Sequence, residues 1–131
     1  MVVEVGPVGL IGVGLIGTSL AKRLLGCGLV VHGFDVVPQR CAPLRSLGLV
    51  EAASAREIGR ACRAVLLAVF DTPQVEQVLE GADGLDPQPG QVVVCVSTCD
   101  PDRIAAVGER LQARGVHFLE AKVYYISDLP A

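Results

Sequence analysis

Short apolar runs alternate with helical patterns along the whole sequence, and this alternation constrains the fold more than any other feature. The apolar runs, each typical of a strand, lie at 8–11, 30–34, 49–50, 64–69, 92–96 and 116–123. Helical spacing or capping residues mark the segments 15–25, 38–47, a short stretch after Ser54, 72–79 and 102–114. Strands separated by helices indicate βαβ units with right-handed crossovers. We therefore predict an α/β fold with a doubly wound parallel sheet, and residues 1–131 as one domain.

Individual segments allow more specific expectations. The run at 64–69 is so continuously apolar that we expect both of its faces to be buried, as in parallel sheets. Pro38 suits the first turn of a helix that ends at Gly48, although Pro43 is compatible only if it too lies early in that helix. Ser54 is expected to cap the next helix in a capping box with Glu57. In the first helix we expect the leucines to face the core: Leu15, Leu20, Leu24 and Leu25.

Composition excludes several classes of function. The net charge is −3 and 51% of the residues are hydrophobic, which suits one packed core and gives no basic stripe for nucleic acid. No apolar run approaches the roughly 18 residues of a membrane span, and the start of the chain lacks a basic secretory signal region. The five cysteines form no CxxC pair, and His32 and His117 stand alone, so we predict no metal site. Reduced cysteines acting as small hydrophobes would suit a cytoplasmic protein.

A glycine-rich loop joins the first expected strand to the first expected helix. Gly12, Gly14 and Gly17 form GxGxxG at the place where a dinucleotide fingerprint belongs. Gly12 would permit the tight turn, Gly14 would let the backbone approach a pyrophosphate, and Gly17 would let helix and strand pack closely. The exposed N–H groups and the helix dipole favour an anion there, the dipole by roughly 0.3–1 kcal/mol.

An acidic residue follows the second expected strand. Asp35 lies about 20 residues after Gly14, where a carboxylate can accept hydrogen bonds from an adenosine ribose. It would repel a 2′-phosphate, so the cofactor expected is NAD in preference to NADP. Arg40 would offset that preference if it reached the site across the intervening helix. The alternative interpretation is a glycine-rich turn next to an acidic surface residue.

Beyond these motifs, the sequence resembles the β-hydroxyacid dehydrogenases, a family that includes 3-hydroxyisobutyrate dehydrogenase and, more distantly, 6-phosphogluconate dehydrogenase. The resemblance lies in VGLIGVGLIG at 8–17, FDVVP at 34–38, GADGL at 81–85, VSTCDP at 96–101 and RGVHFLEA at 114–121. It implies a Rossmann-type cofactor domain, which this family continues with an all-α domain. It also implies hydride transfer between NAD(P) and a 3-hydroxy acid or its semialdehyde. The loop around Thr18 is also similar to prephenate dehydrogenases, which the other segments fit less well.

The resemblance implies a set of cofactor contacts that follow the carboxyl ends of the strands. They are Gly12, Val13, Gly14, Leu15, Ile16, Gly17, Asp35, Val69, Phe70, Gln74 and Thr98. Ligands bind at that edge of open α/β sheets, and Thr98 would offer a hydroxyl near the nicotinamide. The alternatives are that Val69 and Phe70 are simply core residues, and that the pair at 97–98 only caps the next helix.

Two departures from the family pattern limit the functional expectation. Phe70 stands where family members usually have a proline. After Ala121 the family continues Pro-Val-Ser-Gly, whereas residues 122–131 begin Lys-Val-Tyr-Tyr and lack the all-α domain with its catalytic lysine. We interpret Lys122 as a solvated lysine and predict no catalytic residue, so whether the chain is an enzyme stays open.

The function expected is thus the NAD(P)-binding domain of a 3-hydroxyacid dehydrogenase-like oxidoreductase, not catalytic by itself. The alternatives are a non-catalytic dinucleotide-binding module and a truncated gene product too unstable to act. Without further strands, the sixth strand would be an exposed edge on which Val116, Phe118, Leu119 and Val123 favour pairing with another chain. We therefore expect a homodimer through this region.

Overall fold

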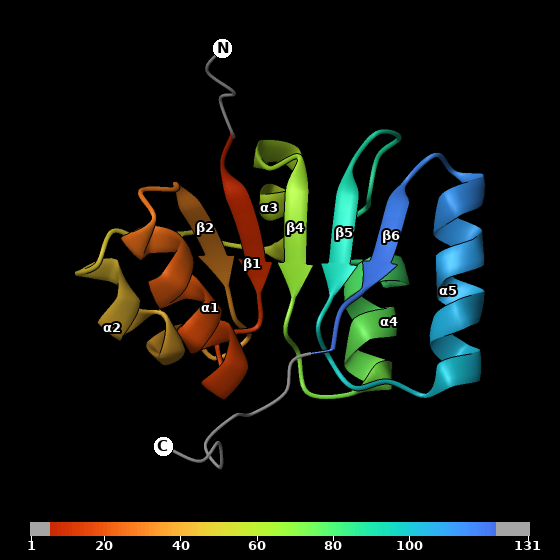
Figure 1. Cartoon of the computed structure of the whole chain (residues 1–131), viewed down its shortest axis with the longest axis horizontal. Coiled ribbons are helices and arrows are strands. Elements are labelled where there is room, and N and C mark those ends of the chain that lie inside the picture. The colour runs from red at the N-terminus through yellow and green to blue at the C-terminus, as the bar shows by residue number, and fades with distance from the viewer. Residues whose placement is uncertain (1–5, 123–131) are drawn as a thin grey trace, which may run out of the picture.

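Residues 6–122 are described in the computed structural model, and six parallel strands run through their centre (Figure 1). The strands are β1 (Val8–Ile11), β2 (Val31–Phe34), β3 (Val50–Glu51), β4 (Ala64–Leu67), β5 (Val92–Cys95) and β6 (His117–Glu120). Their order is β3-β2-β1-β4-β5-β6, and every neighbouring pair is parallel. This is the doubly wound, Rossmann-type sheet that the sequence predicts.

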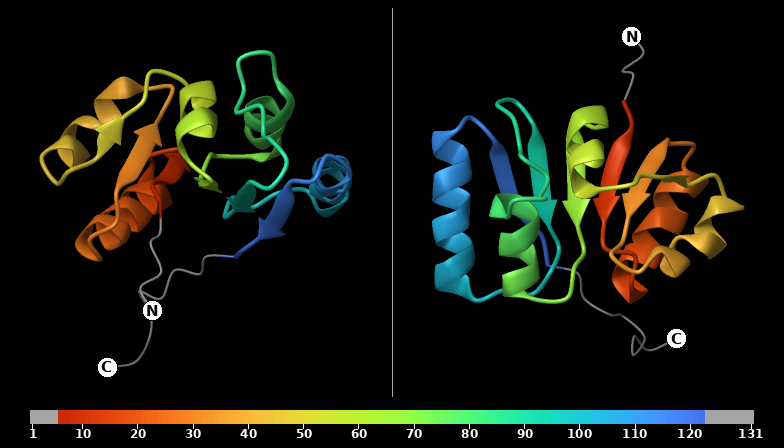
Figure 2. Two further views of the ribbon diagram at one scale, coloured as in Figure 1. Left: turned by 90° about the horizontal axis from the view of Figure 1, so that it is seen from above. Right: turned by 180° about the vertical axis from the view of Figure 1, so that it is seen from behind.

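The helices lie on both faces of the sheet. They are α1 (Leu15–Gly26), the 3₁₀-helix η1 (Pro38–Arg40), α2 (Ala42–Arg45), α3 (Ala55–Ala61), α4 (Thr72–Glu80) and α5 (Pro101–Ala113). In Figure 1, α1 lies in front of β1 and β2, α2 lies at the left side beside α1, and α4 lies behind the strands; Figure 2 gives the views from above and behind. Each face has its own apolar cluster, centred on Leu10 and Leu44 in front and on Val65 and Ile104 behind.

The expectation that β4 is buried on both faces is wrong. Val65 and Leu67 are buried, but Ala64 and Leu66 on the other face are only half-buried. Right-handed crossovers explain the difference, because the connections from β3 to β6 all run in one direction and leave their helices behind the sheet. No described helix covers the front of β4, β5 and β6 (Figure 1).

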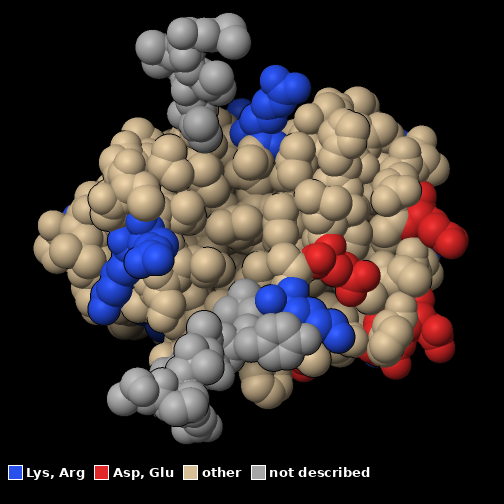
Figure 3. Space-filling view, in the orientation of Figure 1, with Lys and Arg blue, Asp and Glu red and all other residues tan. Residues whose placement is uncertain are grey.

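We call this uncovered surface the open face. The strand registers place two rows of side chains on it, consisting of Ala64, Val92 and His117 and of Leu66, Val94 and Leu119. Leu119 is 55% exposed. Figure 3, which views the molecule from this side, shows mostly uncharged atoms across its centre. The open face therefore presents apolar surface beside β6, an edge strand of the described sheet.

The helix expected at 38–47 is divided into η1 and α2. Both prolines, Pro38 and Pro43, occupy the first turn of their own short helix. A proline ring is tolerated in a first turn but clashes with the preceding turn in a helix interior. Pro43 therefore forces a new helix to begin at Ala42.

Strand and helix ends differ from the prediction by a few residues. The third strand begins at Val50, and the runs at 64–69, 92–96 and 116–123 stop pairing at Leu67, Cys95 and Glu120. Val123, like Tyr124 and Tyr125, lies outside the described residues. Val116 and Phe118 are only 1% and 8% exposed, so, contrary to our expectation, their side chains are not available for contact with another chain.

Helix α1 also differs in the face that it buries. Its buried residues are Gly17 and Ala21, whereas Leu15 is 71% exposed and therefore not a core residue. Small residues on the inner side allow the helix axis to lie close to the sheet. Leu24 and Leu25 pack at the margin of the front cluster, as expected.

Side-chain caps define where three other helices begin. Ser54 Oγ accepts from the N–H of Glu57 at 3.1 Å, and Glu57 Oε2 accepts from the N–H of Ala53 at 2.7 Å. The predicted capping pair is thus present, but Glu57 bonds one residue before the cap. Asp71 and Asp100 cap α4 and α5: like Ser54, each side chain accepts from the N–H group three residues later.

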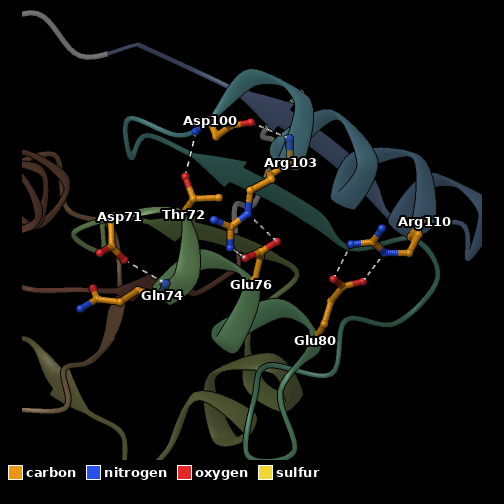
Figure 4. A network of polar contacts seen from close by, with 8 residues as sticks. All are labelled: Asp71, Thr72, Gln74, Glu76, Glu80, Asp100, Arg103 and Arg110. Carbon is orange, nitrogen blue, oxygen red and sulfur yellow. Dashed lines mark hydrogen bonds and ion pairs between the residues drawn. The ribbon is translucent and has the colours of Figure 1, made fainter.

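Ion pairs join α4 to α5 behind the sheet (Figure 4). Arg110 donates two hydrogen bonds of 2.7 Å to Glu80, which lowers the pKa of that carboxyl group, and Arg103 pairs with Glu76. Such half-exposed pairs contribute little free energy, so they mainly orient the two helices.

Among residues 6–122, the helices are too short or too polar for any of them to cross a membrane.

Candidate functional site

The carboxyl ends of β1, β2 and β4 surround a cavity of about 220 Å³. The chain leaves β1 toward β2 on one side, while the neighbouring β4 leads to β5 on the other. Such a switch point is where open α/β sheets bind ligands. The cavity is lined by Ile11, Gly12, Gly14, Phe34, Asp35, Val36, Arg40, Ala68, Val69, Phe70, Gln74, Gln77 and Val78.

The turn at Gly12 shapes this cavity. Gly12 has φ +97°, a conformation that strains other residues, and a Cβ there would collide with the backbone carbonyl of Ala68. Its N–H donates to Phe34 O at 2.9 Å, and the N–H of Ala68 donates to Ile11 O at 2.8 Å. The turn is therefore tied to the ends of β2 and β4 at once.

The other two glycines have different roles. A Cβ on Gly17 would overlap the carbonyl oxygen of Gly12, so helix α1 requires glycine there to pack against the turn. Gly14 has nothing within 4 Å of the Cβ position and ordinary dihedral angles, with φ −81°. The fold thus demands glycine at 12 and 17 but not at 14, where the vacant space opens into the cavity.

The amides of the first turn of α1 lie beside that space. Gly14 is the N-cap and has no side chain to satisfy them, and the first amides of an α-helix have no partner within the helix. Leu15 and Ile16 follow it, exposed and half-buried. This helix end can therefore donate hydrogen bonds to an anion.

Asp35 is buried, with 6% of the residue exposed, so the alternative of an acidic surface residue is wrong. Its Oδ2 accepts from the N–H of Val13 at 2.7 Å, and its Oδ1 accepts from the N–H of Val37 at 2.8 Å. One amide of the glycine loop is therefore already engaged by the carboxylate. Each carboxylate oxygen keeps a further lone pair with which to accept from a ligand hydroxyl.

Arg40 reaches this carboxylate. Its guanidinium lies 3.6 Å from Asp35 Oδ2, with 54% of the arginine side chain exposed. The helix that the sequence places between the two residues begins only at Pro38 and turns Arg40 back toward the cavity.

The residues after β4 line the opposite wall. Val69 is half-buried and packs against the rear cluster, whereas Phe70 is 84% exposed and is not the core residue of the alternative interpretation. The N–H of Phe70 donates to Gln74 Oε1 at 2.8 Å, which fixes Gln74 at the start of α4. Gln77 and Val78 line the same wall but were not predicted as site residues. They lie three and four residues after Gln74, on the same face of α4, so helical spacing could have identified them.

Thr98 lies apart from this cavity, in a second hollow of about 540 Å³ at the ends of β5 and β6. It is exposed, and Asp100 rather than the pair at 97–98 caps α5. Ser97 Oγ donates to Val69 O at 2.7 Å and so ties the two hollows together. Lys122 is exposed at the rim of the second hollow.

Residues 7–124 match the family model described as the NAD binding domain of 6-phosphogluconate dehydrogenase. The chain is 37% identical over 118 residues to L-threonate dehydrogenase of Cupriavidus necator, covering 88% of this chain and 40% of that protein. It is 32% identical over 117 residues to 2-hydroxy-3-oxopropionate reductase of Escherichia coli, with the same two coverages.

Solved structures show the same fold. Psf3 in complex with NADP⁺ and 2-OPP superposes with a TM-score of 0.86 at 25% identity, covering 90% of this chain and 43% of that one. An imine reductase from Myxococcus stipitatus in complex with NADP⁺ has a TM-score of 0.85 at 19% identity, with coverages of 91% and 41%. The chain thus spans about 40% of the length of the relatives that it matches.

The different demands at the glycines give a stability prediction. Gly12→Ala should lower the free energy of unfolding by roughly 1–3 kcal/mol, because it strains the backbone and meets the Ala68 carbonyl. Gly14→Ala, the matched control, should change it by only about 0.5 kcal/mol. Urea unfolding followed by circular dichroism measures both. Equal losses would contradict the assignment, and an unfolding curve without a cooperative transition would favour an unstable gene product.

Proposed function

Because this chain belongs to the β-hydroxyacid dehydrogenase family and carries that family's N-terminal NAD-binding domain, we propose that it holds NAD across the carboxyl edge of its sheet. In this proposal Gly12, Val13, Gly14, Leu15, Ile16, Gly17, Asp35, Val69, Phe70, Gln74 and Thr98 contact the cofactor. The family match supports this family in preference to the prephenate dehydrogenase-like alternative.

The observation that carries the proposal is the vacant Cβ space at Gly14, which the fold itself does not require. It lies where the N-terminus of α1, β1 and β4 meet, so a pyrophosphate fits against the first-turn amides. Because Val13 already donates to Asp35, the amides available to the pyrophosphate are those from Gly14 onward. The carboxylate of Asp35 then faces the ribose.

A bound nicotinamide supplies hydride transfer, and the described residues supply binding and orientation. Proton transfer to a substrate needs an acid or base within hydrogen-bond reach. His32 lies within β2 and His117 at the opposite end of β6, away from the carboxyl edge. We therefore propose that the described residues bind the cofactor without turnover by themselves, and that the substrate class served by the bound cofactor is 3-hydroxy acids or their semialdehydes.

Titration with NADH, followed by nicotinamide fluorescence, tests the site. We expect binding by the native chain and a rise of Kd by at least tenfold, about 1.4 kcal/mol, in Gly14→Val, because the added methyl groups occupy the space for the pyrophosphate. Gly26→Val is the matched control, since it lies at the other end of α1 with equally open space.

Unchanged affinity in Gly14→Val would refute the loop assignment. The same preparations, assayed with NAD and 3-hydroxy acids, should produce no NADH. Measurable turnover would refute the proposal of binding alone.

The preference for NAD over NADP depends on two opposed charges. Asp35 repels a 2′-phosphate, while Arg40, 3.6 Å away and half-exposed, attracts one. The carboxylate is fixed by two backbone hydrogen bonds and the guanidinium is not, so we propose that Asp35 dominates.

Two substitutions test this balance by the ratio of NADPH to NADH dissociation constants. Arg40→Ala should raise the ratio, because it removes the attraction for the 2′-phosphate. Asp35→Asn should lower the ratio by roughly tenfold, because it removes the repulsion but keeps the shape of the side chain. If neither ratio changes, the two residues do not set the preference.

We also propose a homodimer through β6. It is an edge strand of the described sheet, and the open face beside it is apolar. Unpaired edges with apolar neighbours favour pairing with another chain.

Analytical ultracentrifugation at rising concentration should therefore detect a dimer. Leu119→Lys should weaken it, since a charge on the open face opposes burial. Leu47→Lys is the control, because Leu47 is equally exposed, 53% against 55%, but lies after α2. A chain that stays monomeric at every concentration would refute this proposal.

A further inference from the structure

Two cysteines meet at the carboxyl end of β5. Cys95 is the last residue of the strand and is 1% exposed, and Cys99 lies just before the N-cap of α5, partly exposed. Their sulfur atoms are 3.9 Å apart. A disulfide bond has a length of about 2.05 Å, so the two sulfurs need to approach by about 2 Å to form one.

Hydrogen bonds to neighbouring residues hold the loop between the two cysteines in place. Ser97 Oγ donates to Val69 O at 2.7 Å, and the N–H of Asp100 donates to Thr72 Oγ1 at 2.8 Å; Figure 4 shows the second bond. These bonds fix the loop on both sides of Thr98. The cysteine side chains are thus brought together by the fold and not by sequence spacing alone.

The two thiols differ in access to solvent. Both cysteines line the second hollow, but Cys99 is partly exposed whereas Cys95 is 1% exposed, so a small oxidant in solvent reaches Cys99 more readily. Burial and the neighbouring Cys99 raise the pKa of Cys95 to about 12, so Cys95 remains a neutral thiol. An oxidant therefore meets Cys99 first, and Cys95 is placed to react with the product.

We propose that Cys95 and Cys99 form a peroxide-responsive dithiol whose disulfide reshapes the loop carrying Thr98 and weakens dinucleotide binding. The effect on binding rests on the function proposed above, whereas the disulfide does not. Closing the sulfur–sulfur distance pulls on the short segment that contains Thr98, which the Ser97 and Asp100 bonds otherwise hold.

The chemistry balances with hydrogen peroxide as the oxidant. Cys99 sulfur takes one peroxide oxygen to become a sulfenic acid, and the peroxide is reduced to water. As the Cys95 proton passes to the departing oxygen, Cys95 sulfur attacks the sulfenic sulfur, the S–S bond forms and the S–O bond breaks. The hydroxyl group leaves with the Cys95 proton as a second water. One peroxide is consumed, and two thiols become one disulfide.

Mass spectrometry tests the disulfide directly. Trypsin cleaves after Arg63 and Arg103 with no lysine or arginine between them, so peptide 64–103 carries Cys95 and Cys99 and no other cysteine. After peroxide treatment and alkylation, this peptide should have lost two hydrogens and carry no alkyl groups, and dithiothreitol should restore both alkylation sites.

NADH titration of the same samples tests the consequence. Oxidation should raise the Kd of the native chain by roughly fivefold or more, reversibly. Cys99→Ser should form no bridge and keep its affinity after peroxide. Cys27→Ser, which removes the exposed cysteine after α1, should respond like the native chain.

The outcomes separate the two proposals. Peroxide treatment that leaves peptide 64–103 unbridged would overturn the dithiol. A bridge that leaves the Kd unchanged would overturn its effect on binding. If the chain forms the bridge on oxidation but does not bind NADH in its reduced form, the dinucleotide site and the effect on binding are refuted, while the disulfide itself stands.

Discussion

The turn that leaves β1 has no room for a side chain, because the Gly12 backbone passes against the Ala68 carbonyl at the end of β4. The same turn is tied to β2 through the carbonyl of Phe34 and, one residue on, through the carboxylate of Asp35. Three strand ends are therefore fixed relative to one another by a few backbone contacts. The position of α1, the opening beside Gly14 and the depth of the cavity all follow from this packing.

Much of the architecture could be predicted from the sequence because parallel sheets need alternation of apolar strands with helices. The six strands and their parallel arrangement follow from that alternation. Boundaries were less predictable, since a run such as 64–69 remains apolar beyond its last pairing residue, Leu67. The exposure of Leu15 and Leu66 was missed because periodicity shows that a residue is apolar but not whether another element covers it.

The site residues were easier to locate than to describe. The spacing of the glycines and Asp35 places them at one edge of the sheet, and the structure brings them to one cavity. No pattern in the sequence reveals that Asp35 binds the Val13 amide or that Arg40 turns back toward it, because both depend on how η1 leaves β2. Likewise, the resemblance points to Thr98, but only the tertiary structure shows that it lies in a separate hollow tied to Val69 by Ser97.

The uneven cover of the sheet implies a gradient of stiffness across the molecule. β1 has a paired strand on each side and every residue buried, whereas β6 is paired to one described neighbour and bears a single buried side chain. Strands with fewer contacts open locally at lower free energy than central ones. A long ligand bound along the carboxyl ends of the strands would therefore contact the rigid β1 at one end and the more easily opened β6 at the other.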